Sequence, residues 1–145
     1  MRLGKFLTTL LGHRPRPLQA GALCLKEGKV LVISSLDTGR WIIPKGWPMA
    51  GRTLAGAAMQ EAWEEAGVKG RLRPEPIGSF TYAKRSKTGL PRDTEVQVFV
   101  IDVTAMAGDF PEKGQRAREF VSPQEAARRV AEPGLKALLQ QLPPG

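Results

Sequence analysis

The chain has 145 residues, of which 41% are hydrophobic and 25% charged, a balance typical of one folded domain that excludes wholesale disorder. Its 22 basic and 14 acidic residues leave a formal net charge of +8, which favours anionic partners: phosphorylated small molecules, nucleic acid or anionic lipid. A single cysteine excludes an internal disulfide, and together with a single histidine it argues against a zinc site.

Residues 1–18 are expected to form an N-terminal extension, and residues 19–145 a single domain. Pro15 and Pro17 disfavour helix in the residues before them, so the end of the extension is predicted to be an extended linker. A membrane-surface or partner-binding role for the extension is the alternative. The longest apolar runs, such as residues 98–101, are strand-sized, so no membrane-spanning helix is predicted and the cytoplasm is the expected compartment.

The first half of the domain is predicted to begin with strands. Residues 22–25 and 30–33 are apolar runs separated by a glycine-containing turn, which is typical of two antiparallel strands. Residues 40–44 predict a short third strand that a proline ends. Residues 45–52 contain two glycines and a proline and are therefore expected to be a loop.

Residues 53–66 are the most helical stretch of the sequence, with Thr53 as a candidate N-cap and Gly67 at the position of a C-terminal glycine. Further strands are predicted at residues 77–83, 94–103 and 118–121, with a basic loop at 84–92 and helices at 123–130 and 133–140. The last two helices follow a capping box at residues 122–125 and a proline at 133. Strands and helices mixed in this way predict an α/β or α+β sandwich.

The helix at 53–66 carries a cluster of acidic side chains. Glu61, Glu64 and Glu65 fall within an arc of about 100° on the helical wheel. The apolar residues of the other side, which is expected to face the core, are Met59, Ala62, Trp63 and Ala66. Like charges at these spacings destabilise a helix by a few tenths of a kcal/mol per pair, and the helix dipole adds to the penalty. A hard divalent cation such as Mg²⁺ would compensate, whereas the simpler alternative is a solvated acidic surface.

The glycine loop and the acidic helix together resemble the signature box of the Nudix hydrolase family. The matching residues are Gly46, Glu61, Ala62, Glu64, Glu65, Gly67 and Val68. The resemblance covers most of residues 20–131 and implies a mixed sheet between α-helices. It also implies hydrolysis of a phosphoanhydride bond with Mg²⁺, or alternatively Mn²⁺, as cofactor.

Two positions depart from this family pattern. Arg52 stands where the family has its first glutamate, and Gln60 where it has an arginine. In the family, that glutamate and arginine help to hold the loop against the helix by an ion pair. We expect Arg52 to reach a helix carboxylate or a substrate phosphate, and Gln60 to hydrogen-bond the loop backbone.

Within the family, the chain is similar to the branch of diphosphoinositol polyphosphate and diadenosine polyphosphate hydrolases. The similarity rests on residues 40–46, 64–70 and 118–126. Gln19 and Leu36 stand where inositol-phosphate-binding members carry basic side chains, which weakens the inositol alternative. A dinucleoside polyphosphate or another nucleoside diphosphate derivative is left open as the substrate, with diphosphoinositol polyphosphate as a further alternative.

The resemblance implies that three glutamates, Glu61, Glu64 and Glu65, are the metal ligands and the catalytic residues. The general base is left open between one of these and Glu112. The candidate substrate-binding residues are Ser34, Arg40, Lys45, Gly46, Arg52, Arg116 and Arg118, although a solvated surface charge is the alternative for each basic side chain. Trp47 is a candidate for stacking on a base, whereas Trp41 is expected to pack in the core.

A second class of function is a catalytically weak or inactive domain that binds nucleotides or RNA without turnover. Hydrolysis of RNA 5′ ends is a third, suggested only by the basic surface. The basic loop at 84–92 lacks the interleaved aromatic residues of a single-strand binding platform, so nucleic acid is not the favoured partner. The sequence leaves monomer and homodimer open.

Overall fold

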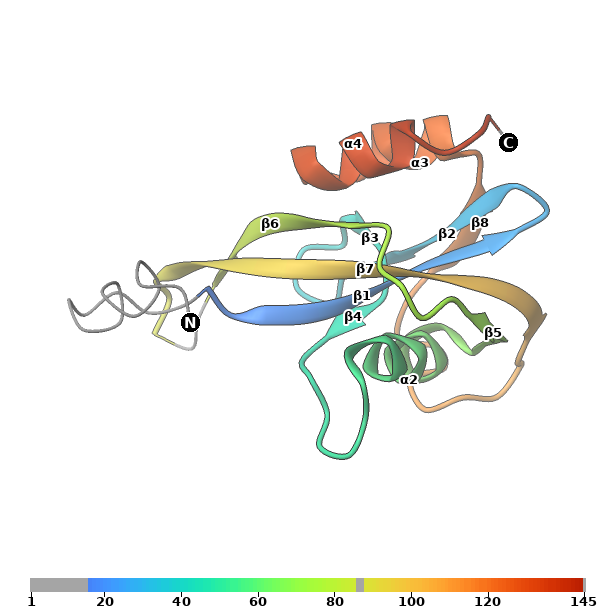
Figure 1. Cartoon of the computed structure of the whole chain (residues 1–145), viewed down its shortest axis with the longest axis horizontal. Coiled ribbons are helices and arrows are strands. Elements are labelled where there is room, and N and C mark those ends of the chain that lie inside the picture. Colours follow the sequence, from blue (N-terminus) through green and yellow to red (C-terminus); the bar gives the residue numbers. More distant parts are fainter. Residues whose placement is uncertain (1–15, 86–87, 145) are drawn as a thin grey trace.

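The computed structural model describes residues 16–85 and 88–144 (Figure 1). Within these ranges, the strands are β1 (Leu18–Lys26), β2 (Lys29–Ser34), β3 (Trp41–Ile42), β4 (Lys45–Gly46), β5 (Val68–Leu72), β6 (Gly78–Arg85), β7 (Pro91–Met106) and β8 (Arg118–Val121). The helices are α2 (Leu54–Ala66), α3 (Pro123–Arg129) and α4 (Pro133–Gln140). Most of the expected extension, residues 1–15, lies outside the described residues.

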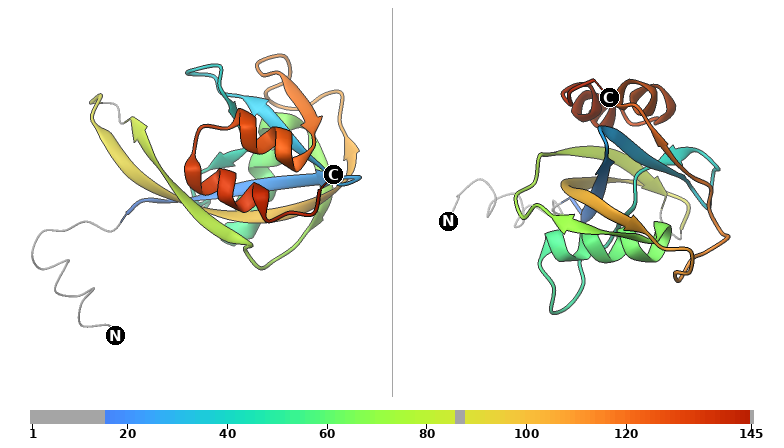
Figure 2. Two further views of the ribbon diagram at one scale, coloured as in Figure 1. Left: turned by 90° about the horizontal axis from the view of Figure 1, so that it is seen from above. Right: turned by 90° about the vertical axis from the view of Figure 1, so that its right-hand side faces the viewer.

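The strands form one mixed sheet with the order β3-β2-β1-β7-β5. Three further strands attach beside this path: β4 pairs with β1, β6 with β7, and β8 with β2. The long central strands β1 and β7 are parallel, and the other pairs are antiparallel. Helix α2 covers one face, and α3 and α4 cover the other (Figures 1 and 2). The predicted α/β (α+β) sandwich is confirmed.

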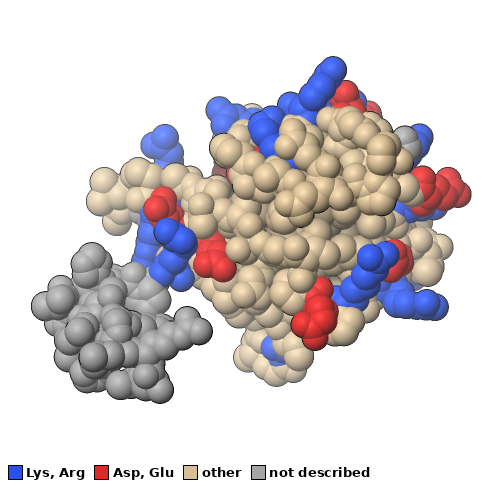
Figure 3. All heavy atoms as spheres, turned by 45° about the horizontal axis from the view of Figure 1, so that its top comes forward, with Lys and Arg blue, Asp and Glu red and all other residues tan. Residues whose placement is uncertain are grey.

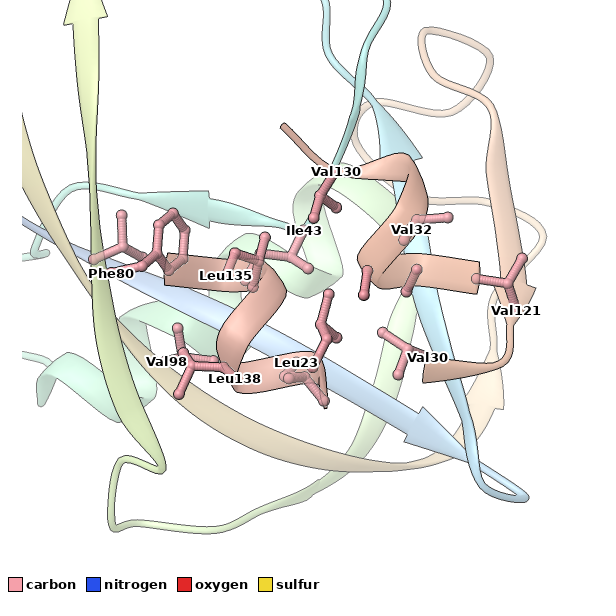
Figure 4. Packing of buried hydrophobic residues seen from close by; sticks show 14 residues of the cluster. Leu23, Val30, Val32, Ile43, Phe80, Val98, Val121, Val130, Leu135 and Leu138 are labelled. Carbon is pink, nitrogen blue, oxygen red and sulfur yellow. The ribbon is translucent and has the colours of Figure 1, made fainter. Parts of the chain in front are cut away.

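Two apolar layers hold the helices to the sheet. Under α3 and α4, Leu135 and Leu138 pack with Leu23, Ile43 and other strand residues (Figure 4). Each fully buried side chain of this size stabilises the fold by about 1.5–3 kcal/mol relative to its exposed state. Under α2 the layer is built largely from alanines, namely Ala55, Ala57, Ala58, Ala62 and Ala66. These small side chains allow the helix axis to approach the sheet closely, which brings the acidic residues of α2 near the strands.

The predicted caps at Thr53, Gly67 and Ser122 are confirmed, whereas the Glu125 side chain of the predicted capping box pairs with Arg128 and Arg129 instead. The Thr53 hydroxyl accepts a hydrogen bond from the Gly56 N–H at 3.0 Å, and Gly67 ends α2 with a left-handed φ of 70°. The Ser122 hydroxyl accepts from the Glu125 N–H at 3.1 Å at the start of α3. No helix among the described residues is long and apolar enough to cross a membrane.

Several strand boundaries differ from the prediction because pairing extends beyond the apolar runs. Strand β1 begins at Leu18, where it already pairs with β7. Residues 45–46, predicted as loop, form β4 by pairing with Ala20 and Gly21, although a two-residue strand has no alternation to reveal it. Residues 68–72 form β5, an element that was not predicted, on the outer edge of β7. The loop expected at 84–92 is shorter, since β6 continues to Arg85 and β7 begins at Pro91.

Candidate active site

Strand β4 and helix α2 meet where Glu61 lies against Gly46. A Cβ atom added to Gly46 would lie 2.3 Å from the carboxylate carbon of Glu61. Only a glycine leaves room for that carboxylate, so the side chain of Glu61 is held against the backbone of β4. The predicted glycine loop and acidic helix are therefore in direct contact.

Glu65, one turn along α2, is bound by two donors from distant parts of the chain. Its Oε1 accepts from the backbone N–H of Lys45 at 3.1 Å, and its Oε2 accepts from Nη2 of Arg116 at 3.3 Å. The Glu65 residue is only 8% exposed, so the alternative of a solvated acidic surface does not hold for this side chain. Burial follows because β4 and the segment before β8 both close over this turn of α2.

Arg116 is the centre of the polar network at this site. Its Nε donates to Glu112 at 3.2 Å and its Nη1 donates to the carbonyl oxygen of Ser34 at 3.1 Å. The Ser34 hydroxyl is also engaged, since it accepts from the Ala117 N–H at 2.9 Å. Arg116 and Ser34, predicted as substrate contacts, here join β2, α2 and the segment before β8.

Glu64 and Arg118 lie toward the C-terminal end of α2. The carbonyl oxygen of Glu64 accepts from the Glu112 N–H at 3.0 Å, so the loop that carries Glu112 is fixed to the helix. The Arg118 guanidinium donates to the carbonyl oxygens of Ala66, at 2.6 Å, and Ala107, at 3.1 Å. A cation at the last carbonyls complements the helix dipole, so Arg118 stabilises the end of α2.

Burial, aided by neighbouring carboxylates, raises two pKa values at the site. The pKa of Glu61 is raised to about 7 by burial and by the nearby charges of Glu64 and Glu112. The pKa of Glu65 is also raised to about 7, chiefly by burial, although Arg116 opposes the shift. The raised pKa values show that the ionised form of both side chains is disfavoured at this site, and a bound cation would favour that ionised form.

The chemistry of the donor set suits a hard divalent ion. The three glutamates of α2 and Glu112 offer only oxygen atoms, which Mg²⁺ and Mn²⁺ accept as ligands. Among residues 16–85 and 88–144, no group of three or more Asp, Glu, His or Cys side chains lies close enough together to hold a metal ion. Glu65 would have to exchange part of its contact with Arg116 to become a ligand. The residues therefore fit the ion in the kind of donor atom that they offer, and binding would require these side chains to move.

Lys45 points away from the carboxylates, although its backbone contacts Glu65. Its ammonium lies 5.0 Å from the ring centre of Tyr82, which packs against the core under α3 and α4. Burial lowers the pKa of Lys45, and the charge of Glu132 opposes that shift. The Tyr82 hydroxyl in turn donates to the buried amide oxygen of Gln19 at 2.7 Å. The sequence contained no signal for this second polar cluster, because its members come from separate strands and a helix end.

Two of the predicted substrate-binding residues, Arg40 and Arg52, do not contact the acidic side chains of the site. Both are exposed, and within the described ranges neither forms an ion pair with the carboxylates. The expected link from Arg52 to a carboxylate of α2 is therefore absent here, and its contact with a substrate phosphate stays a prediction. Gln60 likewise forms no hydrogen bond to the loop in the described part of the chain, because it is Glu61 that faces β4.

The three tryptophans lie in different surroundings. Trp41 packs against the core under α3 and α4, as predicted, with the Arg129 guanidinium 5.2 Å from its ring. Trp63 was expected to face the core but is only partly buried, with Lys69 over its ring at 5.5 Å, because alanines fill the contact with the sheet. Trp47 is 47% exposed directly after β4.

The family model of the NUDIX domain matches residues 15–142. This chain belongs to the Nudix family. Nudix hydrolase 12, mitochondrial, of Arabidopsis thaliana is 36% identical over 103 residues, which cover 68% of this chain and 50% of that protein. Diphosphoinositol polyphosphate phosphohydrolase 3-beta of Bos taurus is 32% identical over 116 residues, covering 76% of this chain and 66% of the relative. The chain thus spans about half the length of the plant relative.

Solved structures show the same fold at low sequence identity. A Caenorhabditis elegans Ap4A hydrolase superposes with a TM-score of 0.59 at 18% identity, covering 87% of this chain and 95% of that one. The dihydroneopterin triphosphate pyrophosphohydrolase of Escherichia coli gives a TM-score of 0.68 at 16% identity, covering 87% and 94%. At these identities the likeness establishes the architecture, as the resemblance to the Nudix box predicted.

Proposed function

We propose that this Nudix domain hydrolyses a phosphoanhydride bond of a small polyphosphate, with Glu61, Glu64 and Glu65 holding Mg²⁺ or Mn²⁺. The observation that carries the proposal is the fixed contact between α2 and β4, in which Glu61 fills the space above Gly46. This contact fixes the carboxylate-bearing helix α2 beside β4, so a metal ion held by the carboxylates could bind a phosphate chain there. The named relatives support the reaction class, since both are hydrolases in name.

Bound at these carboxylates, a divalent ion would polarise the phosphoryl oxygens and activate a water molecule. The chain's own residues would control the charge around it. Arg116 neutralises part of the carboxylate cluster and fixes Glu65 and Glu112 in position. One of the helix glutamates or Glu112 would accept a proton from the attacking water.

The proposed substrate is a nucleoside polyphosphate. Two of the comparisons involve polyphosphate hydrolases by name, one for diphosphoinositol polyphosphate and one for Ap4A. At two positions where inositol-phosphate-binding members of the family carry basic side chains, this chain has uncharged residues. Gln19 is buried and bound to Tyr82, and Leu36 is an exposed apolar side chain. We propose the cytoplasm as the compartment, and the chain as a monomer or homodimer.

A phosphate-release assay with added Mg²⁺ tests the proposal. Glu64→Gln and Glu65→Gln should each abolish release from a panel of dinucleoside polyphosphates, nucleotide sugars, oxidised nucleotides and inositol pyrophosphates. Glu75→Gln is the matched control, because it removes the same charge from an exposed loop. Undiminished release in both helix variants would contradict the assigned roles.

A second candidate is a domain that binds nucleotides or RNA without turnover. The ion pair of Arg116 with Glu65 favours it, since that contact occupies a proposed metal ligand. Nucleotide binding by the wild-type protein, with no phosphate release from any member of the panel, would establish this alternative. Including triphosphorylated and capped RNA in the panel tests hydrolysis of RNA 5′ ends.

A further inference from the structure

A separate pocket lies at the end of the sheet that α3 and α4 leave uncovered. It has a volume of about 370 Å³ and is lined by Pro17, Trp47, Lys84, Arg85, Arg92 and Thr94. Its walls come from the residue before β1, the residue after β4, and the paired ends of β6 and β7. Figure 3 shows Lys and Arg side chains together with some acidic side chains at the projecting end of the molecule. The volume is within the range of sites that bind small molecules.

The pocket adjoins the carboxylate site through β4. Trp47 follows Gly46 directly, and consecutive Cα atoms are about 3.8 Å apart. Gly46 faces Glu61 on one side of the strand, whereas Lys45 faces Tyr82 on the other. A ligand that extends around the outer edge of β4 would therefore reach both the carboxylates and Trp47.

Trp47 provides an exposed aromatic surface in this pocket. Its 47% exposure stands out against Trp41, whose ring is half-buried and covered by Arg129. The amphipathic indole ring can stack on another flat ring at a cost of little side-chain entropy. The neighbouring Pro17 contributes a second apolar wall.

Three basic side chains, Lys84, Arg85 and Arg92, line the pocket. Lys84 and Arg92 are directly opposite in the β6–β7 register, two residues beyond the pair of Tyr82 and Thr94. Like charges at such a position destabilise an antiparallel pair. Within 16–85 and 88–144, no acidic side chain forms an ion pair with Lys84, Arg85 or Arg92. An anion bound between them would remove this repulsion.

We infer that this pocket binds the nucleoside end of the substrate, with the base stacked on Trp47 and phosphate oxygens paired with Lys84 and Arg92. The inference rests on the proposed function and narrows its substrate class to nucleotides. A polyphosphate without an aromatic ring would satisfy the cations and leave the indole in water. The pocket has room for one base, which favours a single nucleotide over a run of single-stranded RNA.

Calorimetric titration of the full chain in EDTA tests the inference without turnover. ATP and inorganic tripolyphosphate share the same charged group and differ by the nucleoside. Base stacking on an aromatic side chain should make the wild-type protein bind ATP about 5- to 150-fold more tightly than tripolyphosphate. Trp47→Ala should remove this preference, and Trp47→Phe should retain most of it. Equal affinities in the wild type, or a preference that survives Trp47→Ala, would overturn the inference.

Charge variants separate the phosphate contacts from a general effect of net charge. Lys84→Gln and Arg92→Gln should weaken ATP and tripolyphosphate by similar factors and reduce the salt dependence of both. Arg71→Gln, which removes one charge from exposed β5, should change neither. Equal losses in all three variants would show that only overall charge matters and would refute the site. Tighter binding of an adenine decanucleotide than of ATP by more than tenfold would indicate a strand platform and also refute it.

The outcomes for this pocket and for the proposed reaction are distinct. Glu64→Gln should lose phosphate release with Mg²⁺ yet keep its ATP affinity in EDTA. If the wild type binds ATP through Trp47 but releases no phosphate from any nucleotide, the pocket stands and the proposed hydrolysis fails. If Glu64→Gln abolishes release while Trp47→Ala leaves the ATP preference intact, the hydrolysis stands and the pocket is refuted.

Discussion

Replacing Arg116 by methionine removes the cation that holds two acidic side chains of the site. The side chains of Arg116 and Glu65 are each only 9% exposed, so the charge left on Glu65 would remain buried. Breaking a buried pair costs about 3–5 kcal/mol. The N–O distances of 3.3 Å to Glu65 and 3.2 Å to Glu112 are longer than those of strong charge-assisted bonds. We therefore expect the lower value, about 3 kcal/mol.

The measurement is urea unfolding of metal-free protein at pH 8, where Glu65 is largely ionised. In thermal unfolding, the same loss of about 3 kcal/mol would lower Tm by about 6–12 °C for a chain of this length. Arg128→Met is the matched control, because the pair of Arg128 with Glu125 lies on the surface, with the arginine 77% exposed. A surface pair of this kind contributes at most about 1 kcal/mol.

The pH dependence gives this prediction a second test. The pKa of Glu65 is already raised to about 7 by burial, so ionisation of this carboxyl destabilises the fold. Arg116→Met would raise the pKa of Glu65 further. The loss of stability should therefore be largest at pH 8 and shrink as the pH falls to 5.5 and the carboxyl becomes protonated. A loss below about 1 kcal/mol at pH 8 would refute the reasoning, as would an equal loss at both pH values, because a buried pair predicts neither.

Three further predictions follow from the described contacts. Gly46→Ala places a methyl group against the Glu61 carboxylate, so the rate of phosphate release should fall about 100-fold. The control is Gly108→Ala, which should leave the rate unchanged because nothing lies within 4 Å of the added atom. Metal-free protein should lose stability as the pH rises from about 5 to 7 and change little above that, because the pKa values of Glu61 and Glu65 are raised from 4.5 to about 7. Mg²⁺ at pH 8 should restore on the order of 1 kcal/mol, and a flat Tm profile would contradict this. Burial raises the pKa of the Cys24 thiol far above its usual range, so a thiol reagent should label it only as urea unfolds the chain, and rapid labelling of native protein would show that the strand opens.

Pairing between strands explains most of the differences from the sequence-based prediction. Residues 68–72 alternate poorly and were not predicted as a strand, yet β5 forms because the exposed edge of β7 offers backbone partners. Residues 84–92 were predicted to be a loop because they are polar and basic. In the structure, the pairing of β6 with β7 continues into this segment as far as Arg85 and Pro91. Local composition carries little information on such segments, because the partner strand supplies the hydrogen bonds.

The amino-acid sequence by itself determined helix α2, its Thr53 and Gly67 caps, and the cluster of three glutamates on that helix. These features depend on residues within a few positions of one another, where the helical period fixes the geometry. Only the tertiary structure decided that Arg116 binds Glu65, 51 residues away, and Ser34, 82 residues away. Only the tertiary structure likewise placed Trp47 and Lys84 in the walls of one pocket. Contacts of this length depend on how the strands pair, and no spacing along the chain encodes that pairing.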